Sequence, residues 1–199
     1  MKKLALILIS LAAATTTMVL TCNTASYAST RQEGILKDTT GKEDPMVQRG
    51  KYLVTIMGCQ DCHSPKRMGP HGPEPDPALD LSGHPQNQPI GKIDPETLKS
   101  WVLFNHNATA MAGPWGVSFA ANLTSDPTGI GSWTEEQFFK AIRQGKYKGL
   151  DNTRPLLPPM PWPQYARASD EDLRAIFAYL KSTKPVQNVV PAAIPPAKR

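Results

Sequence analysis

Two cysteines and a histidine stand together in the chain as Cys59-Gln60-Asp61-Cys62-His63. A Cys-x-x-Cys-His run is typical of covalent haem attachment, because its thiols can add across the two porphyrin vinyl groups while the imidazole ligates the iron. Two intervening residues let both sulfurs reach the vinyl groups, and the adjacent His63 is then placed beneath the iron. The motif predicts one covalently bound haem c, held by Cys59 and Cys62, with His63 as an axial ligand of the iron.

Three other readings of the motif remain open from the residues alone. A structural zinc site usually has a second Cys/His pair, but the remaining cysteine, Cys22, lies in a segment that we expect to be removed. A thioredoxin-like redox pair follows a strand, whereas the residues before Cys59 have a helical pattern. A plain disulfide would leave His63 without a role.

The N-terminal segment has the pattern of a secretory signal peptide. Lys2 and Lys3 precede an uncharged, largely apolar run over residues 4–20, and residues 26–28 read Ser-Tyr-Ala. Small residues at the first and third positions of such a triplet are typical of a cleavage site. We therefore expect residues 1–28 to be removed and the mature protein to be periplasmic. Membrane association would follow only if this segment stays uncleaved or if Cys22 is lipidated.

The charge of the chain gives no reason to expect a nucleic-acid partner. Its 199 residues hold 22 basic and 17 acidic side chains. Loss of Lys2 and Lys3 leaves 20 basic against 17 acidic, and two haem propionates would bring the protein close to neutrality. The basic residues are scattered instead of clustered, so no electrostatic footprint for nucleic acid is present.

The mature chain divides into three parts by composition. Residues 29–43 are polar with few apolar side chains and are expected to form a flexible leader. Residues 44–184 are long enough for one domain with one core. Residues 185–199 are Pro-rich and are expected to form an extended C-terminal tail.

Capping signals predict four helices in the domain. They begin at the Asp-Pro pairs 44–45 and 94–95, at the capping box of Thr134 and Gln137, and at Ser169. The first should run into the haem motif, and the others should end near Val102, Gly145 and Lys184, before Pro185.

No stretch alternates between polar and apolar residues for long enough to predict a pair of strands. Residues 64–93 are dense in Pro and Gly and read as a long loop, and residues 112–129 read as a second irregular segment. The predicted fold is therefore all-α, a cytochrome c-like single domain with short helices and long Pro/Gly-rich loops around one haem. Gly50 in the first helix should permit close approach of the last helix, near Ile176 and Leu180.

The iron needs a ligand on its other face or an open position for a small molecule. Met160 is the favoured ligand, because Pro158, Pro159 and Pro161 stiffen the loop that presents it. Met57 falls on the apolar stripe of the first helix, and Met111 is the second choice. The remaining candidates are Met46, Met68, His71, His84 and His106, of which the three histidines are expected in solvated loops. A His63–Met160 pair raises the reduction potential and leaves no open position, which favours electron transfer.

Further segments resemble those of mono-haem c-type cytochromes, and more closely those related to the cytochrome c subunit of bacterial membrane-bound alcohol dehydrogenases. The resemblance extends from Pro45 to Lys184. It is carried by the haem motif and by the segments 49–53, 121–126, 128–134, 159–162 and 169–173. It implies haem binding through Cys59, Cys62, His63 and Met160, and it places the loop with Trp115 and Asn122 at the haem edge. The dehydrogenase subunits have several haem domains, whereas this sequence has one haem motif.

These features predict an electron carrier and not an enzyme. Its expected partners are redox proteins, a dehydrogenase as donor and an oxidase as acceptor. Six basic residues could form a docking face for an acidic partner or simply a solvated surface: Lys66, Arg67, Lys140, Arg143, Lys146 and Lys148. Two alternatives stay open, a haem enzyme or gas sensor with a displaceable sixth ligand, and an electron-transfer subunit that works only within a dehydrogenase complex.

Overall fold

The computed structural model describes residues 43–196. The predicted signal peptide, Cys22 and the predicted leader up to residue 42 lie outside the described residues. The helical elements are α1 (Pro45–Ile56), α2 (Cys59–His63), η1 (Thr97–Lys99), α3 (Glu135–Gln144), η2 (Tyr147–Gly149), α4 (Trp162–Tyr165) and α5 (Asp170–Ser182). The strands are β1 (Lys66–Gly69), β2 (Gly72–Pro75), β3 (Leu103–Phe104), β4 (Ala110–Gly113) and β5 (Gly116–Phe119). Within the described part, no helix is both long and apolar enough to cross a membrane.

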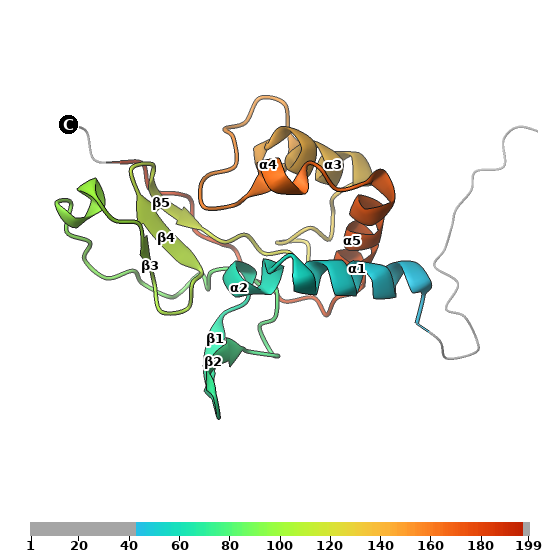
Figure 1. The fold of residues 1–199 in the computed structure, drawn as a ribbon, viewed down its shortest axis with the longest axis horizontal. Helices are drawn as coiled ribbons and strands as arrows, with labels where there is room; N and C mark the ends of the chain where they lie inside the picture. The colour runs from blue at the N-terminus through green and yellow to red at the C-terminus, as the bar shows by residue number, and fades with distance from the viewer. Residues whose placement is uncertain (1–42, 197–199) are drawn as a thin grey trace, which may run out of the picture. The chain divides into compact units, whose positions relative to one another are not determined.

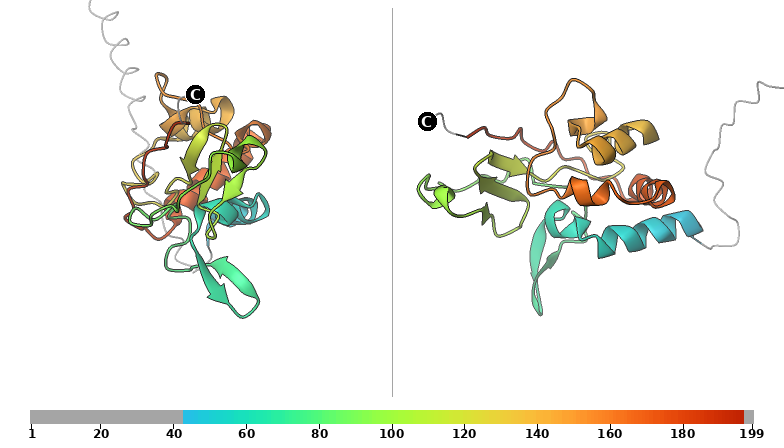
Figure 2. Two further views of the ribbon diagram at one scale, coloured as in Figure 1. Left: turned by 90° about the vertical axis from the view of Figure 1, so that its left-hand side faces the viewer. Right: turned by 45° about the horizontal axis from the view of Figure 1, so that its top comes forward.

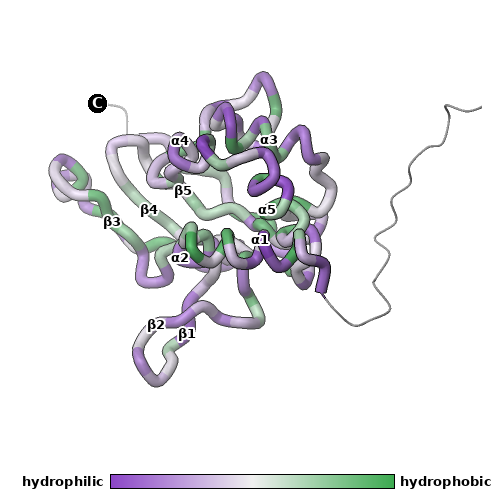
Figure 3. The backbone as a smooth tube through the Cα atoms, turned by 45° about the vertical axis from the view of Figure 1, so that its right-hand side comes forward, coloured by the Kyte–Doolittle hydropathy of each residue, from purple (hydrophilic) through white to green (hydrophobic). Residues whose placement is uncertain are grey.

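Helices α1 and α5 lie side by side and form one wall of the core (Figure 1). Both begin where their caps predict. The Asp44 carboxylate accepts a hydrogen bond from the Met46 backbone N–H at 2.8 Å, and the Ser169 hydroxyl accepts one from the Asp172 N–H at 3.1 Å. The apolar stretches of both helices appear in green in Figure 3. Their buried side chains are Leu53, Val54, Leu173, Ala175, Ile176 and Leu180.

The contact between these helices is closest at Gly50. A Cβ atom added to Gly50 would lie 1.9 Å from the backbone carbonyl oxygen of Ala175 and 2.7 Å from Cβ of Tyr179. The close approach predicted at Gly50 is thereby confirmed. The glycine costs helix propensity, but it lets the two backbones meet without a side chain between them.

Replacing Gly50 by alanine should therefore destabilise the haem-loaded protein. We expect Gly50→Ala to lower the free energy of unfolding by about 3 kcal/mol, because α1 must shift away from the α5 backbone. Denaturant unfolding followed by circular dichroism measures this change. The matched control is Gly91→Ala, since a Cβ at Gly91 has no atom within 4 Å. Equal stability of the two variants would mean that the helices are not in such close contact.

Helix α3 has both ends that its sequence predicts. The Thr134 hydroxyl accepts a hydrogen bond from the Gln137 N–H at 3.2 Å, and the Gln137 side-chain oxygen accepts one from the Thr134 N–H at 3.0 Å. The helix ends at Gly145, which has a left-handed backbone conformation with φ of 62°. Phe138 then packs against Phe177 of α5, with ring centroids 5.2 Å apart.

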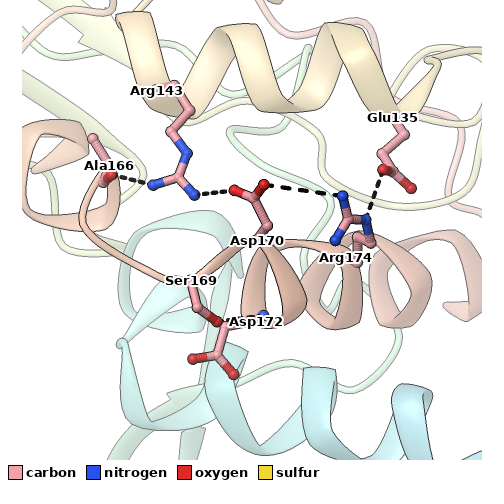
Figure 4. A network of polar contacts seen from close by, with 7 residues as sticks. All are labelled: Glu135, Arg143, Ala166, Ser169, Asp170, Asp172 and Arg174. Carbon is pink, nitrogen blue, oxygen red and sulfur yellow. Dashed lines mark hydrogen bonds and ion pairs between the residues drawn. The ribbon is translucent and has the colours of Figure 1, made fainter.

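Charged side chains fix α3 relative to α4 and α5 (Figure 4). Arg143 donates to the carboxylate of Asp170 at 2.5 Å and to the backbone carbonyl of Ala166. Arg174 donates to Glu135 at 3.2 Å, and its guanidinium lies 4.0 Å from Asp170. Such partly exposed pairs add little stability one by one. Their geometry joins the start of α5 to both ends of α3.

The all-α fold predicted from the sequence is wrong in one respect, because two small antiparallel sheets accompany the helices. Strands β1 and β2 form a hairpin directly after α2, with Lys66 opposite Pro75 and Gly69 opposite Gly72. Strands β3, β4 and β5 form a sheet in that order, with Met111 opposite Ser118. The hairpin extends away from the helices, and the sheet lies beyond α2, as the views in Figures 1 and 2 agree.

The sequence pattern does not indicate these strands, for two physical reasons. Every residue of β4 is buried, so its sequence, Ala-Met-Ala-Gly, shows no alternation of polar and apolar residues. Strand β2 contains Pro73 and Pro75, which usually argue against a strand. These prolines are two residues apart, so their nitrogens face the same edge, and a two-stranded ribbon leaves one edge unpaired. The predicted helix from Asp94 to Val102 also shrinks to the single turn η1.

The C-terminal segment is extended, and it packs along the domain. The Asn122 side-chain amide donates to the backbone carbonyl of Val186 at 2.8 Å. The Asn188 side-chain amide donates to the carbonyls of Ser82 at 2.7 Å and His84 at 2.9 Å. Further along, the segment pairs with the outer edge of β5. Residues 185–196 therefore form part of the wall of the domain.

Candidate haem site

A cleft of about 270 Å³ lies between α2, the segment after β5, helices α3 and α5, and the loop before α4. It opens into the hydrophobic core, because Ile130, Phe138, Leu173 and Ile176 belong both to the cleft wall and to the core cluster. Its lining includes all four site residues predicted from the sequence: Cys59, Cys62, His63 and Met160. The fold thus brings together residues that are about a hundred positions apart in the chain.

Helix α2 places the motif on one face. Gly58 has a left-handed conformation with φ of 67°, so α1 ends and α2 starts in a new direction. Residues three and four apart share a face of a helix, which groups Cys59 with Cys62 and with His63. All three side chains therefore meet at the cleft wall.

The imidazole of His63 is held by a single backbone group. Its Nδ1 lies 2.8 Å from the carbonyl oxygen of Ala121, in the segment that follows β5. A carbonyl can only accept, so Nδ1 carries the proton and Nε2 keeps its lone pair. Burial lowers the pKa of His63, and the hydrogen bond to Ala121 opposes this effect in part. The ring is thus held neutral, in the tautomer that can ligate a metal through Nε2.

A partly buried polar cluster fixes the C-terminal end of α2. The Ser64 hydroxyl, fully buried, donates to the Asp80 carboxylate at 2.6 Å and accepts from the Leu81 N–H at 2.9 Å. The side-chain amide of Gln60 donates to the same carboxylate at 3.0 Å. Asp80 and Leu81 therefore hold the C-terminal end of the haem motif in place.

Lys66 caps the C-terminal end of α2. Its ammonium group donates to the backbone carbonyls of Gln60 at 3.1 Å, Asp61 at 2.9 Å and Ser64 at 2.5 Å. Carbonyls at a helix C-terminus have no partner within the helix, and a cation there also favours the helix dipole. Burial lowers the pKa of Lys66, while the negative charge of Asp61 raises it.

The two thiols are protonated at neutral pH. Burial raises the pKa of Cys59 to about 11, and the charge of Asp61 adds to that rise. Burial also raises the pKa of Cys62. Both are free cysteines. Thiols with a raised pKa react poorly as thiolates, which argues against a thioredoxin-like redox pair.

Met160 lies in a loop with a defined path. The peptide between Pro158 and Pro159 is cis, and the Met160 N–H donates to the carbonyl of Leu157 at 3.3 Å. Helix α4 follows immediately, and the Tyr165 hydroxyl donates to the backbone carbonyl of Met57 at 2.6 Å. Burial raises the pKa of Tyr165 to about 12, so this donor keeps its proton.

The other candidate ligands, His84 apart, fall into two groups, those that line the cleft and those that are exposed. Met57 and Met111 also line the cleft. Met46 and Met68 are exposed, Met68 to 80%. His71 and His106 are exposed.

His84, expected in a solvated loop, is instead fully buried and lies outside the cleft lining. Its ring nitrogens bond to the Thr109 hydroxyl at 2.9 Å and the Gln88 carbonyl at 3.1 Å. Its ring also packs 4.8 Å from that of Phe119.

The burial of His84 predicts a loss of stability in acid. Burial lowers the pKa of His84 below its ordinary value of 6.5, so the unfolded chain binds a proton more readily than the folded one. The stability that this histidine contributes is complete above pH 6.5 and falls as the pH drops below it. Urea unfolding between pH 7.5 and 5 should show this slope, and His84→Gln should flatten it. An unchanged slope in that variant would contradict the assignment.

Most of the basic residues proposed as a docking face already have partners. Arg67 pairs with Glu74 at 2.9 Å, Lys140 pairs with Asp151 at 2.9 Å, and Lys146 donates to the carbonyl of Asp151 at 3.3 Å. Arg143 and Lys66 are engaged as described above. Lys148 is exposed and contributes to the rim of the cleft.

Sequence reasoning missed the backbone and C-terminal parts of the site. The carbonyl of Ala121 has no sequence signature, because every residue carries one. Val189, Val190, Pro191 and Ala193 of the supposed tail also line the cleft. Their apolar character, within a segment otherwise rich in proline, was the one sign in the sequence that this segment could pack against the cleft. Asn122 lines the cleft as the resemblance implies, whereas Trp115 is not among the lining residues and donates to Ser118 at 3.2 Å.

The residues present fit a haem c. An apolar cleft holds two thiols and a neutral imidazole with a free Nε2, together with a thioether from another segment. A zinc site fits poorly, because within residues 43–196 no group of three or more His, Cys, Asp or Glu side chains has an arrangement that could hold a metal ion. The donor set therefore favours haem among the readings that the sequence left open.

Comparison with known proteins points in the same direction. No protein-family model matches the chain. It is 34% identical over 137 residues to the gluconate 2-dehydrogenase cytochrome c subunit of Pantoea cypripedii, covering 68% of this chain and 23% of that protein. It is 31% identical over 153 residues to the cytochrome c subunit of the quinone-type alcohol dehydrogenase of Gluconobacter oxydans, covering 75% and 24%.

A third relative is the fructose dehydrogenase cytochrome subunit of Gluconobacter japonicus, 30% identical over 145 residues, with 71% of this chain and 22% of that protein covered. The chain spans about a quarter of the length of these curated relatives. The resemblance stated from the sequence is thus confirmed. The chain is homologous to the cytochrome c subunits of bacterial dehydrogenases.

Proposed function

We propose that the chain is a one-electron carrier with one haem c bound covalently through Cys59 and Cys62 and ligated by His63 and Met160. The observation that carries this proposal is the convergence of all four side chains on one apolar cleft, with the His63 ring held by Ala121 so that Nε2 is free. The homologous cytochrome c subunits support the same role.

The bound haem supplies an iron that cycles between two oxidation states. The chain's own residues set the conditions for this cycle. The apolar lining excludes water, which disfavours the more highly charged oxidised state. The Ala121 carbonyl fixes the imidazole tautomer, and the Met160 thioether would occupy the iron position that an oxygen-binding or peroxide-using protein leaves open.

The same proposal extends to location and partners. The signal-peptide pattern supports a periplasmic site, which also suits attachment of haem c outside the cytoplasm. The relatives are named as subunits of gluconate, alcohol and fructose dehydrogenases. The electron donor would therefore be the catalytic subunit of a dehydrogenase, with an oxidase as the class of acceptor.

Export of the full chain into a bacterial periplasm with haem-attachment machinery tests the proposal. We expect one haem per chain that survives extraction with acidified organic solvent, a low-spin spectrum, and reversible one-electron reduction. The reduced protein should not bind carbon monoxide within the time of mixing. Immediate binding would instead support a gas sensor or haem enzyme, and a chain without covalent haem would overturn the proposal.

A further inference from the structure

The hydroxyl of Ser118 links β5 to the loop that presents Met160. It donates to the backbone carbonyl of Pro158 at 2.7 Å, two residues before the methionine. It also accepts a hydrogen bond from the indole N–H of Trp115 at 3.2 Å. Ser118 is only 7% exposed. The hydroxyl itself is therefore largely shielded from solvent.

The Met160 loop depends on such a donor from outside. Pro158, Pro159 and Pro161 have no backbone N–H, so the loop can form few hydrogen bonds of its own. The contact from Met160 N–H to Leu157 is long, at 3.3 Å. The Ser118 hydroxyl is the much shorter contact, and it comes from a strand that is paired on both sides, by β4 and by the C-terminal segment at Ile194.

The same short segment also holds the other candidate iron ligand. Ala121, three residues after Ser118, accepts the hydrogen bond from Nδ1 of His63 at 2.8 Å. Residues 118–121 thus contact the His63 ring through a carbonyl and the Met160 loop through a hydroxyl. One continuous stretch of chain therefore contacts both ligand-bearing segments.

We propose that Ser118 is a positioning residue for Met160, and that β5 with its extension to Ala121 sets the spacing of the two axial ligands. This inference rests on the proposed function, because it assumes that Met160 ligates the haem iron. Loss of the hydroxyl removes the hydrogen bond to the Pro158 carbonyl and lets the loop move away from the iron.

The test compares Ser118→Ala, Ser118→Thr and Ser82→Ala in the haem-loaded protein. Ser82 is the matched control, because it is 2% exposed and its hydroxyl also donates to a backbone carbonyl, that of Leu79, at 2.7 Å. Two readouts report on the methionine bond: the weak absorption band of iron–methionine ligation in the oxidised protein, and the rate of carbon monoxide binding to the reduced protein. Unfolding of each variant measures stability separately.

We expect Ser118→Ala to raise the fraction of iron open to carbon monoxide about tenfold, the effect of one lost hydrogen bond on the loop equilibrium. Ser118→Thr should restore the wild-type value, since it keeps the hydroxyl. Ser82→Ala should lower stability but leave both readouts unchanged. If Ser118→Ala does not fold, Trp115→Phe removes the donor to Ser118 and should shift the same readouts in the same direction.

Equal carbon monoxide binding in Ser118→Ala and Ser82→Ala, with the methionine band intact in both, would overturn the inference while leaving the carrier function in place. Failure of the proposed function has a different result. In that case the wild-type protein itself would lack the methionine band or bind carbon monoxide at once.

Discussion

Met160→Ala should open the haem iron and lower its reduction potential. Loss of the thioether removes the ligand that favours the reduced state and leaves a position for water or an added ligand. We expect a fall in potential on the order of 0.1 V, within the range of about 0.8 V that axial ligands set. The reduced variant should bind carbon monoxide within the mixing time. Redox titration and visible spectra measure both effects.

The chain supplies controls of matched chemistry. Met68→Ala removes a methionine that is 80% exposed on β1, so it should change neither the potential nor the spectrum. Met111→Leu is the sharper control, because Met111 is buried and lines the same cleft. Carbon monoxide binding in Met111→Leu, with none in Met160→Ala, would assign the sixth ligand to Met111.

The sequence predicts the parts of this site that side-chain chemistry encodes. The haem motif indicates few other kinds of site, and the capping residues Thr134 and Ser169 indicate helix starts. The structure confirms both helix starts. The proline-rich setting marked Met160, and the structure places it in the cleft with the motif. In each case the signal is local, because a cap, a proline or a Cys-x-x-Cys-His spacing acts within a few residues.

The rest could not be predicted, because it depends on contacts between distant segments. The carbonyl of Ala121 positions His63 through a backbone group that any residue would supply. The burial of His84 and the pairing of Val117 with Ile194 depend on contacts between segments that are far apart in the sequence. Strand β4 is buried on every residue, so alternation, the usual sign of a strand, is absent.

Removal of the two thiols should have the second large effect. In the double variant Cys59→Ser, Cys62→Ser the haem can be held only by its axial ligands, so acidified organic solvent should extract it completely. Cys22→Ser is the matched control, because it removes the third cysteine and lies outside the motif. That variant should keep its covalent haem, and a change only in its membrane association would indicate lipidation of Cys22. Covalent haem in the double variant would contradict attachment through these thiols.

The same variant should also unfold far more easily once the haem has left. The cleft opens into the core, and an apolar cavity costs about 24 cal/mol per Å³ when nothing fills it. For a cleft of about 270 Å³, the upper bound is on the order of 6 kcal/mol, which is comparable to the net stability of a typical domain. We therefore expect the extracted double variant to lose most of its cooperative unfolding transition, whereas Cys22→Ser keeps it. A cooperative transition that survives haem removal would show that α1 and α5, in contact at Gly50, hold the domain together without the cofactor.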